Sequence, residues 1–361
     1  MKKMSKLRLG VCLCVVALLY FGAWYAETSM GTNSMLVTVL KKGAVYALIA
    51  VSMNLLNGFT GLFSLGQAGF MLLGAYTYGI FTIPAADRAS VYQYFDGGVV
   101  QFALPVPVAL ILAGLVAAAF AFLIGLPVLR LKSDYLAIAT LGFAEIIRAV
   151  FQWNVLGPIT NGSNLLRKFP VFQSTISYFV VVGICVAVIL LLINSSYGRA
   201  FKSIREDEIA AEAMGINLAR HKMLAFCISS FFAGIGGALL AMYQTSVQAS
   251  IFKSAMTYEI LLMVVIGGIG SITGSVIASF LYISASEWWL RFLDSGSFMG
   301  MSVPFFRDGF RKVVFSVVIM VIVLFFSRGI MGDKELSFAG MIRRLRGKKA
   351  VPAAEGEEDA Q

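Results

Sequence analysis

Charged side chains inside the apolar stretches are the first residues of this chain that could do chemistry. They are few: Glu145, Arg148, Glu259 and Glu287. Glu145 and Arg148 are three residues apart and would meet on one face of a helix. Because a charge near the centre of a bilayer costs about 2.5–3.5 kcal/mol on insertion scales, we expect these two to pair with each other. A proton relay needs more acidic partners than these, which argues against proton coupling.

Glycine-rich stretches at residues 57–69, 139–145 and 266–274 are the second candidate feature. Glycine allows close helix packing, but it also allows a helix to break where its exposed backbone faces protein or a watery cavity. Ser64 and Gln67 favour a break in the first stretch, because lipid would penalise their polar side chains. We predict a translocation path along the first and third stretches, with helix packing alone as the alternative. Its residues are Ser64, Gln67, Gly69, Gly267, Gly268, Gly270 and Ser271.

A strongly charged segment at residues 198–216 interrupts the apolar stretches once. Glu206, Asp207 and Glu208 precede an Ala-rich run, and acids are favourable near a helix N-terminus. We therefore predict a helix over residues 203–216 that a soluble partner can bind.

Enzyme chemistry has little support in this sequence. There is no G-x-x-x-x-G-K-[ST] motif for nucleotide binding, no nucleophile elbow and no His-containing constellation. The single His221 cannot build a metal centre, and the four cysteines lie in apolar segments without the spacing of a ligand cluster. We expect no enzyme activity, no metal and no cofactor bound by this chain.

Apolar stretches about 15–25 residues long must position all of these groups, and about 20 apolar residues cross the ~30 Å hydrocarbon core of a bilayer. The composition agrees, with 59% hydrophobic and 13% charged residues. The predicted fold is all-α: a polytopic transmembrane helix bundle of about ten spans (8–10) with broken helices. The expected spans lie near residues 9–26, 36–58, 62–83, 101–126, 134–153, 176–194, 223–243, 257–269, 273–290 and 311–327.

Lys and Arg residues set the orientation, because they are more frequent in cytoplasmic loops. A cytoplasmic N-terminus with alternating spans places most of the 29 Lys and Arg residues inside, so both termini are expected in the cytoplasm. The net charge of +10 therefore reflects topology and lipid contact, not nucleic acid. Residues 1–26 resemble a signal peptide, but we expect an uncleaved first helix because further spans follow. The membrane domain covers residues 1–332, and residues 333–361 form a polar tail with too few apolar residues to fold.

Several motifs together give the chain a family resemblance. They are residues 61–76, which begin Gly-Leu-Phe-Ser-Leu-Gly-Gln-Ala-Gly, residues 134–148, the charged loop through Gly215, residues 264–274 (Val-Val-Ile-Gly-Gly-Ile-Gly-Ser-Ile-Thr-Gly) and residues 328–332. With these motifs the chain resembles the permease subunits of branched-chain amino-acid ABC transporters, of the LivM type.

The resemblance implies an inner-membrane importer of Leu, Ile and Val, with two ATPase subunits that bind ATP, a homologous permease and a periplasmic binding protein. It also implies a cytoplasmic coupling helix, within a loop at about residues 195–222, that docks into the ATPase. The coupling residues by this resemblance are Ile204, Glu208, Ala211, Met214 and Gly215.

Two departures from the family pattern bear on these expectations. The coupling pattern is Glu-Ala-Ala, three residues, then Gly, but before Gly215 this chain has Ile209-Ala-Ala211, with Glu208 one place earlier. In the outer loop, Thr160-Asn-Gly-Ser-Asn-Leu165 replaces a Thr-Gly-Gly-Ser-Asp-Gly-like run. Urea, amides or other amino acids are therefore alternative substrates. An ion-coupled secondary transporter and a membrane-embedded enzyme are the other classes considered.

Overall fold

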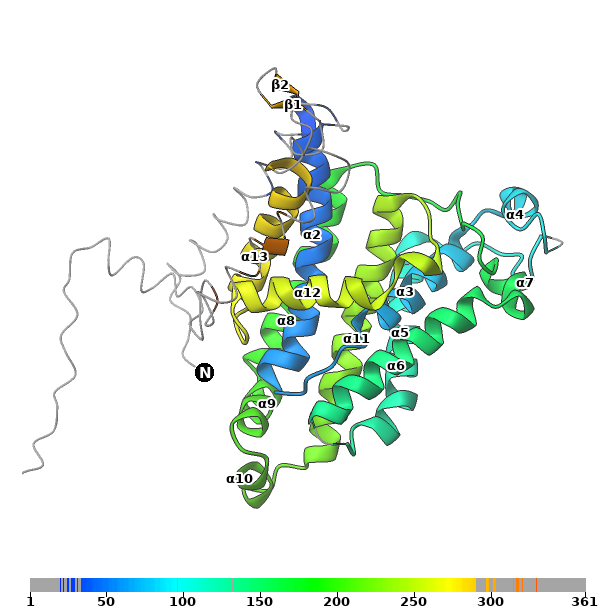
Figure 1. Cartoon of the computed structure of the whole chain (residues 1–361). Coiled ribbons are helices and arrows are strands. Elements are labelled where there is room, and N and C mark those ends of the chain that lie inside the picture. The colour runs from blue at the N-terminus through cyan, green and yellow to red at the C-terminus, as the bar shows by residue number, and fades with distance from the viewer. Residues whose placement is uncertain are drawn as a thin grey trace, which may run out of the picture.

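The computed structural model describes residues 34–289 except 96 and 132, with a few further positions (20, 22, 25, 27–29, 31, 297–298, 301–302, 314, 316–317, 320 and 329). Apart from loops, one bridge between Leu166 and Val247, and the antiparallel pair of β1 (Ser297–Phe298) with β2 (Met301–Ser302), the regular structure in these residues is helical (Figure 1). The helical elements are α2 (Met35–Asn54), η1 (Leu55–Phe59), α3 (Gln67–Thr82), α4 (Ala85–Val91), α5 (Val106–Val128), α6 (Ser133–Gln152), η2 (Asn154–Leu156), α7 (Gly157–Thr160), α8 (Thr175–Ile193), α9 (Ser196–Glu206), α10 (Glu208–Ala213), α11 (Leu218–Gln244), η3 (Ala249–Ile251), α12 (Ser254–Gly267), α13 (Ile272–Ser284) and η4 (Ala285–Trp289).

Five helices in the described residues are long and apolar enough to cross a membrane. They are α2 continued by η1, then α5, α6, α8 and α11. The spans expected at 62–83, 257–269 and 273–290 are shorter helices of 16, 14 and 13 residues. The spans expected at 9–26 and 311–327 fall mostly outside the described residues, and the tail 333–361 falls wholly outside them. The chain is thus a multi-pass membrane protein built of helices.

Helix α11 is the centre of the packed core, and it contacts α2, α3 and α5 (Figure 1). Glycines bring these backbones together. A β-carbon on Gly237 would lie 2.0 Å from the carbonyl oxygen of Met71 in α3, and one on Gly74 would lie 2.0 Å from the carbonyl oxygen of Gly234. At such distances no side chain fits, so α3 and α11 meet backbone to backbone.

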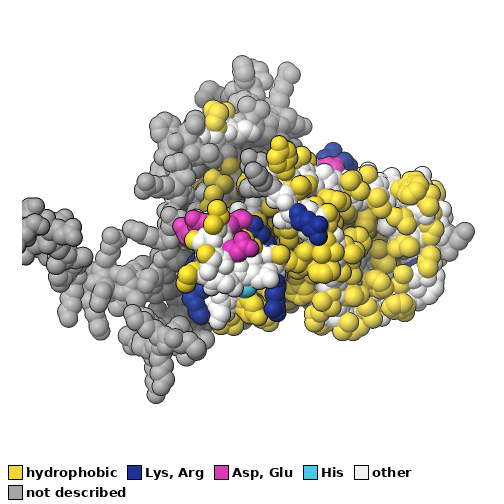
Figure 2. Space-filling view, turned by 90° about the horizontal axis from the view of Figure 1, so that it is seen from below, with side chains coloured by type: hydrophobic (Ala, Val, Ile, Leu, Met, Phe, Trp, Pro, Cys, Tyr) yellow, Lys and Arg dark blue, Asp and Glu magenta, His cyan; other side chains and the backbone are white. Residues whose placement is uncertain are grey.

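The outward faces of α5, α6 and α8 carry large apolar side chains that the described chain leaves uncovered. Leu123, Ile138 and Leu191 are 62%, 68% and 73% exposed, and Figure 2 shows a broad hydrophobic surface beside the charged cluster of side chains. A soluble monomer rarely exposes apolar patches of this extent. These faces are suited to lipid.

Gly237→Ala should lower the thermal unfolding midpoint of the detergent-solubilised protein. The added β-carbon meets the Met71 carbonyl, so the helices must separate, at a cost of about 1–3 kcal/mol. The matched control is Gly142→Ala, because nothing lies within 4 Å of a β-carbon there, and alanine is the better helix former. Equal midpoints for the two variants would contradict the close α3–α11 contact.

Candidate functional site

Two helix interruptions meet near one end of α2. The first runs from the π-helix η1 through residues 60–66 to the start of α3, which confirms the predicted break. The second lies between the end of α12 at Gly267 and the start of α13 at Ile272. We call residues 55–66 together with residues 267–271 the broken-helix junction. Gly268 and Gly270 have φ of +112° and +88°, which side chains rarely adopt, and this explains two of its glycines.

Asn54 connects the two interruptions. Its side chain is fully buried. The Nδ2 group donates to the Ser271 carbonyl at 3.0 Å and to Ser275 Oγ at 2.8 Å. Oδ1 accepts from the Gly270 backbone N–H at 2.8 Å. One amide therefore satisfies polar groups in the α12–α13 turn and in the first turn of α13, which hydrocarbon could not do.

Other side chains supply hydrogen-bond partners for the backbone groups of the first interruption. Asn57 Oδ1 accepts from the Ser64 N–H at 3.1 Å, and its Nδ2 donates back to the Ser64 carbonyl. Thr140 of α6 accepts from the Leu65 N–H, and Thr257 of α12 accepts from the Ala68 N–H. The start of α3 is thus capped by residues distant in the sequence.

The predicted path residues come together at the junction, but they lie inside the protein. Ser64 and Gln67 are 4% exposed and Ser271 is fully buried. Gln67 donates to Ser52 Oγ at 2.7 Å. Gly69 packs on Ala144, and Gly267 packs on Gly274. In this conformation these residues make packing and capping contacts, as in the alternative interpretation of the glycine-rich stretches.

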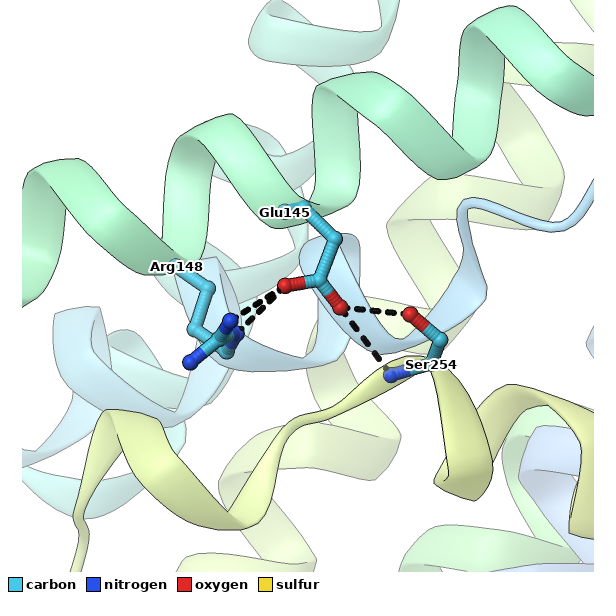
Figure 3. A network of polar contacts seen from close by, with 3 residues as sticks. All are labelled: Glu145, Arg148 and Ser254. Atoms are coloured by element: carbon cyan, nitrogen blue, oxygen red, sulfur yellow. Dashed lines mark hydrogen bonds and ion pairs between the residues drawn. The ribbon is translucent and has the colours of Figure 1, made fainter.

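The predicted pairing of Glu145 with Arg148 is confirmed, and it includes a third residue (Figure 3). Arg148 Nε donates to Glu145 Oε2 at 2.7 Å, and Nη2 contacts the same oxygen. Glu145 Oε1 accepts from both the backbone N–H and the hydroxyl of Ser254, the first residue of α12. The carboxylate thus lies at the positive end of a helix dipole. A quarter of the Arg148 side chain and a third of the Glu145 side chain remain exposed.

The charged segment forms two helices, not the single helix expected over 203–216. Asp207 has an extended backbone between α9 and α10, and its Oδ1 accepts from the N–H groups of Ile209 and Ala210. Asp is a strong N-cap and a poor helix-interior residue, which explains the break. Lys222 pairs with Glu208 at 2.6 Å and ties α10 to α11. We call residues 196–215 the coupling segment, after the role that the sequence resemblance leads us to expect for them.

Burial divides the coupling segment into two sets of residues. Ile204 and Ala211 are 2% and 1% exposed, so they hold the segment on its own chain. Ile209 and Met214 are 82% and 83% exposed. Gly215 has φ of +84° with open space around it, and it ends this surface. Figure 2 shows acidic side chains gathered here beside basic ones.

A second contact joins the coupling segment to the junction. Arg205 Nη1 donates to the Gly58 carbonyl at 3.1 Å, and Lys202 Nζ lies 5.5 Å from the centre of the Phe59 ring. Neither Arg205 nor Asn54 is among the residues that the sequence predicts for a functional site. Asn54 could have been recognised as an amide within an apolar stretch. Arg205 could not, because the Gly58 carbonyl that it binds is 147 residues away and no local pattern indicates this contact.

In the loops away from the broken-helix junction, buried polar side chains hold the backbone in place. Arg88 is 1% exposed and donates to the carbonyls of Ile80 and Phe102. Burial lowers the pKa of this guanidinium, and burial raises the pKa of Tyr92 to about 12. Asn161 donates to the carbonyls of Val91 and Leu165. Residues 160–165, which depart from the family pattern, are therefore held in the loop structure by these hydrogen bonds. Within the described residues, no group of His, Cys, Asp and Glu could hold a metal ion.

Known proteins similar to this chain are permeases. Residues 35–327 match the family described as the permease component of branched-chain amino acid transport systems. The chain is 33% identical over 311 residues to the high-affinity branched-chain amino acid transport permease LivM of Escherichia coli K12, covering 76% of this chain and 68% of the relative. It is 23% identical to a probable LivM of Methanocaldococcus jannaschii (83% and 94% covered) and 23% identical to LivH of Escherichia coli K12 (81% and 93% covered). No solved structure matches the chain significantly.

Glu145→Gln and Arg148→Gln should each lower the thermal unfolding midpoint in detergent, because each leaves one charge without its partner. The double variant should recover part of the loss, with a coupling energy of about 0.5–3 kcal/mol. Ser254→Ala is the control, since it keeps the backbone donor to Glu145 and should lose less. Strictly additive losses would show that the two charges act separately.

Proposed function

Since this chain belongs to the family of permease components of branched-chain amino acid transport systems, we propose that it is a membrane-spanning subunit of an ABC importer in the bacterial inner membrane. Separate subunits bind and hydrolyse ATP, and this chain is a transport subunit, not an enzyme. The proposed partners are two ATPases, a homologous permease, a periplasmic substrate-binding protein and membrane lipid.

The exposed apolar residues of the coupling segment carry the proposal. Ile209 and Met214 protrude from a segment that Ile204 and Ala211 anchor underneath. The Lys222–Glu208 ion pair braces the same segment from α11. An apolar side chain that is more than four-fifths exposed on a braced, charged surface suits a protein pocket better than water. We assign these two residues to the ATPase cleft, with Gly215 and Glu208 beside them.

The substrate follows from the relatives. Those compared above carry names that refer to branched-chain amino acid transport, so leucine, isoleucine and valine are the proposed substrates. Urea and amides are the alternative for this family. The binding protein supplies specificity, and the permease supplies the path.

We also propose that both termini lie in the cytoplasm and that the chain has about ten spans, because of the distribution of Lys and Arg residues. One contact supports an uncleaved first helix. Tyr20, within the first apolar run, donates to the Phe179 carbonyl of α8 at 2.9 Å, and cleavage after residue 26 would remove it. Glu27 Oε2 accepts from the Thr175 N–H at 3.0 Å and from the Ser174 hydroxyl, and so caps α8 whether or not residues 1–26 are removed.

Orientation can be tested with single cysteines in a background without the native ones. Ser163→Cys should react with an impermeant thiol reagent added outside spheroplasts, and Ala213→Cys should react only after the membrane is opened. Both positions are exposed, so accessibility does not bias the comparison. Labelling of Ala213→Cys from outside would show that the orientation is the opposite of the one proposed.

The docking role predicts that Ile209→Glu with Met214→Glu prevents co-purification of the ATPases with the tagged permease. A charge in an apolar pocket is costly to desolvate, so association should weaken by at least ten-fold, on the order of 1.4 kcal/mol. Val155→Glu is the matched control, because Val155 is 67% exposed in the loop that begins at η2.

Import by the unmodified complex completes this test. Proteoliposomes with the binding protein should take up radiolabelled leucine when ATP is present, and excess valine but not urea should compete. Normal ATPase association in the double variant would contradict the docking role. Competition with leucine uptake by urea but not by valine would contradict the proposed substrates and favour urea and amides.

A further inference from the structure

We propose that Arg205 is the positioning residue through which the ATPases act on the broken-helix junction. This inference rests on the docking role proposed for the coupling segment, and it identifies how that segment reaches the membrane helices. Arg205 lies near the end of α9, two residues before Asp207, the N-cap of α10.

One arm of the Arg205 guanidinium points into the membrane domain. Nη1 donates to the carbonyl of Gly58, near the end of η1, at 3.1 Å. The same Nη1 atom lies 3.0 Å from the place that a β-carbon on Gly270 would occupy. A single nitrogen therefore bonds the first interruption of the junction and lies beside the second.

The backbone around Gly61 keeps this arm in place. A β-carbon on Gly61 would lie 3.0–3.3 Å from Cγ, Cα and Cβ of Arg205. The chain there has φ of +74°, which favours glycine. Lys202, one turn earlier on α9, lies over the Phe59 ring. Residues from two turns of α9 thus hold η1 and the segment after it.

The junction continues this contact into the core. A β-carbon on Gly58 would lie 2.5 Å from the Gly270 nitrogen, and that nitrogen donates to Asn54 Oδ1. Asn54 in turn donates to Ser275 in α13. A displacement of Arg205 therefore acts on a continuous set of close contacts between η1, α2 and α13.

The other arm of Arg205 points toward the proposed docking surface. Nε donates to Glu206 Oε1 at 3.1 Å, and Nη2 pairs with the same oxygen. The Glu206 side chain is 69% exposed, on the same segment as Ile209. A partner that contacts Glu206 therefore bears directly on the guanidinium whose inner arm holds Gly58.

Arginine is suited to this double contact. Its planar guanidinium presents five N–H donors in fixed directions, so one face can bind a carboxylate while another donor binds a carbonyl. A lysine ammonium is a single point of charge on a flexible stem and would hold the two sides less rigidly. A residue that only anchored α9 would need the inner contact alone.

The test uses the complete complex of permeases, ATPases and binding protein in proteoliposomes, with ATP hydrolysis and radiolabelled leucine uptake measured together. For Arg205→Gln we expect assembly and hydrolysis to persist, while the ATP hydrolysed per leucine imported rises on the order of ten-fold, within the usual range of site-to-site coupling. Arg205→Lys should give an intermediate ratio. The matched control is Arg199→Gln, because Arg199 lies on the same helix and donates to Ser196 Oγ of that helix at 3.2 Å.

The ratio of ATP hydrolysed to leucine imported distinguishes a positioning role of Arg205 from one of only anchoring α9. An unchanged ratio in Arg205→Gln, whether both rates are normal or both fall in parallel, overturns the proposal. If Arg205→Gln does not assemble, Arg205→Lys and Glu206→Gln decide by the same ratio. Glu206→Gln keeps the contact of Arg205 with Gly58 and weakens only its ion pair with residue 206. A normal ratio in both Arg205→Lys and Glu206→Gln would also overturn the proposal. Failure of the unmodified complex to associate or to import would instead contradict the proposed function.

Discussion

Backbone hydrogen bonding at the broken-helix junction is the constraint on which the rest of this structure depends. A helix that ends leaves up to four N–H or four C=O groups without partners, and each costs several kcal/mol in hydrocarbon. Asn54, Asn57, Thr140 and Thr257 supply those partners from four places in the chain. Helices can break here because buried side chains replace the lost backbone bonds, and the positions of α2, α6 and α12 follow from that need.

The same bonds bear on how a path can open. Polar side chains of the junction are engaged with each other and with the backbone, and Ser64, Gln67 and Ser271 are buried. A hydrogen bond contributes only about 0.5–1.5 kcal/mol net when water can replace it. Entry of water would therefore exchange these bonds at small net cost, whereas entry of lipid would leave them unmade. A junction of this kind favours a closed state yet tolerates a hydrated one.

Local rules predicted the features that depend on neighbouring residues. The Glu145–Arg148 pair follows from helical spacing, and the break before Gln67 follows from polar residues in an apolar stretch. Asp207 could also have been recognised as an N-cap by its residue type, but the Ala-rich run after it favoured one helix. The contacts of Asn54 with Ser275 and of Arg205 with Gly58 join residues more than 140 positions apart. No periodicity or motif identifies such partners, because they are fixed by how the helices pack.

Packing density also determines which parts of the membrane domain can move. Between α3 and α11, backbone atoms meet with no room for a β-carbon at Gly74 or Gly237, and shifting one helix past the other would require separating both along their length. The junction is as close at Gly58 and Gly267, but its backbone is joined largely by side-chain hydrogen bonds, such as those of Asn54 and Asn57. Water can replace such bonds at small net cost, so residues 55–66 and 267–271 can rearrange without separating α3 from α11. Since Arg205 contacts the domain at that place, a displacement of the coupling segment reaches residues that can move while the core stays packed.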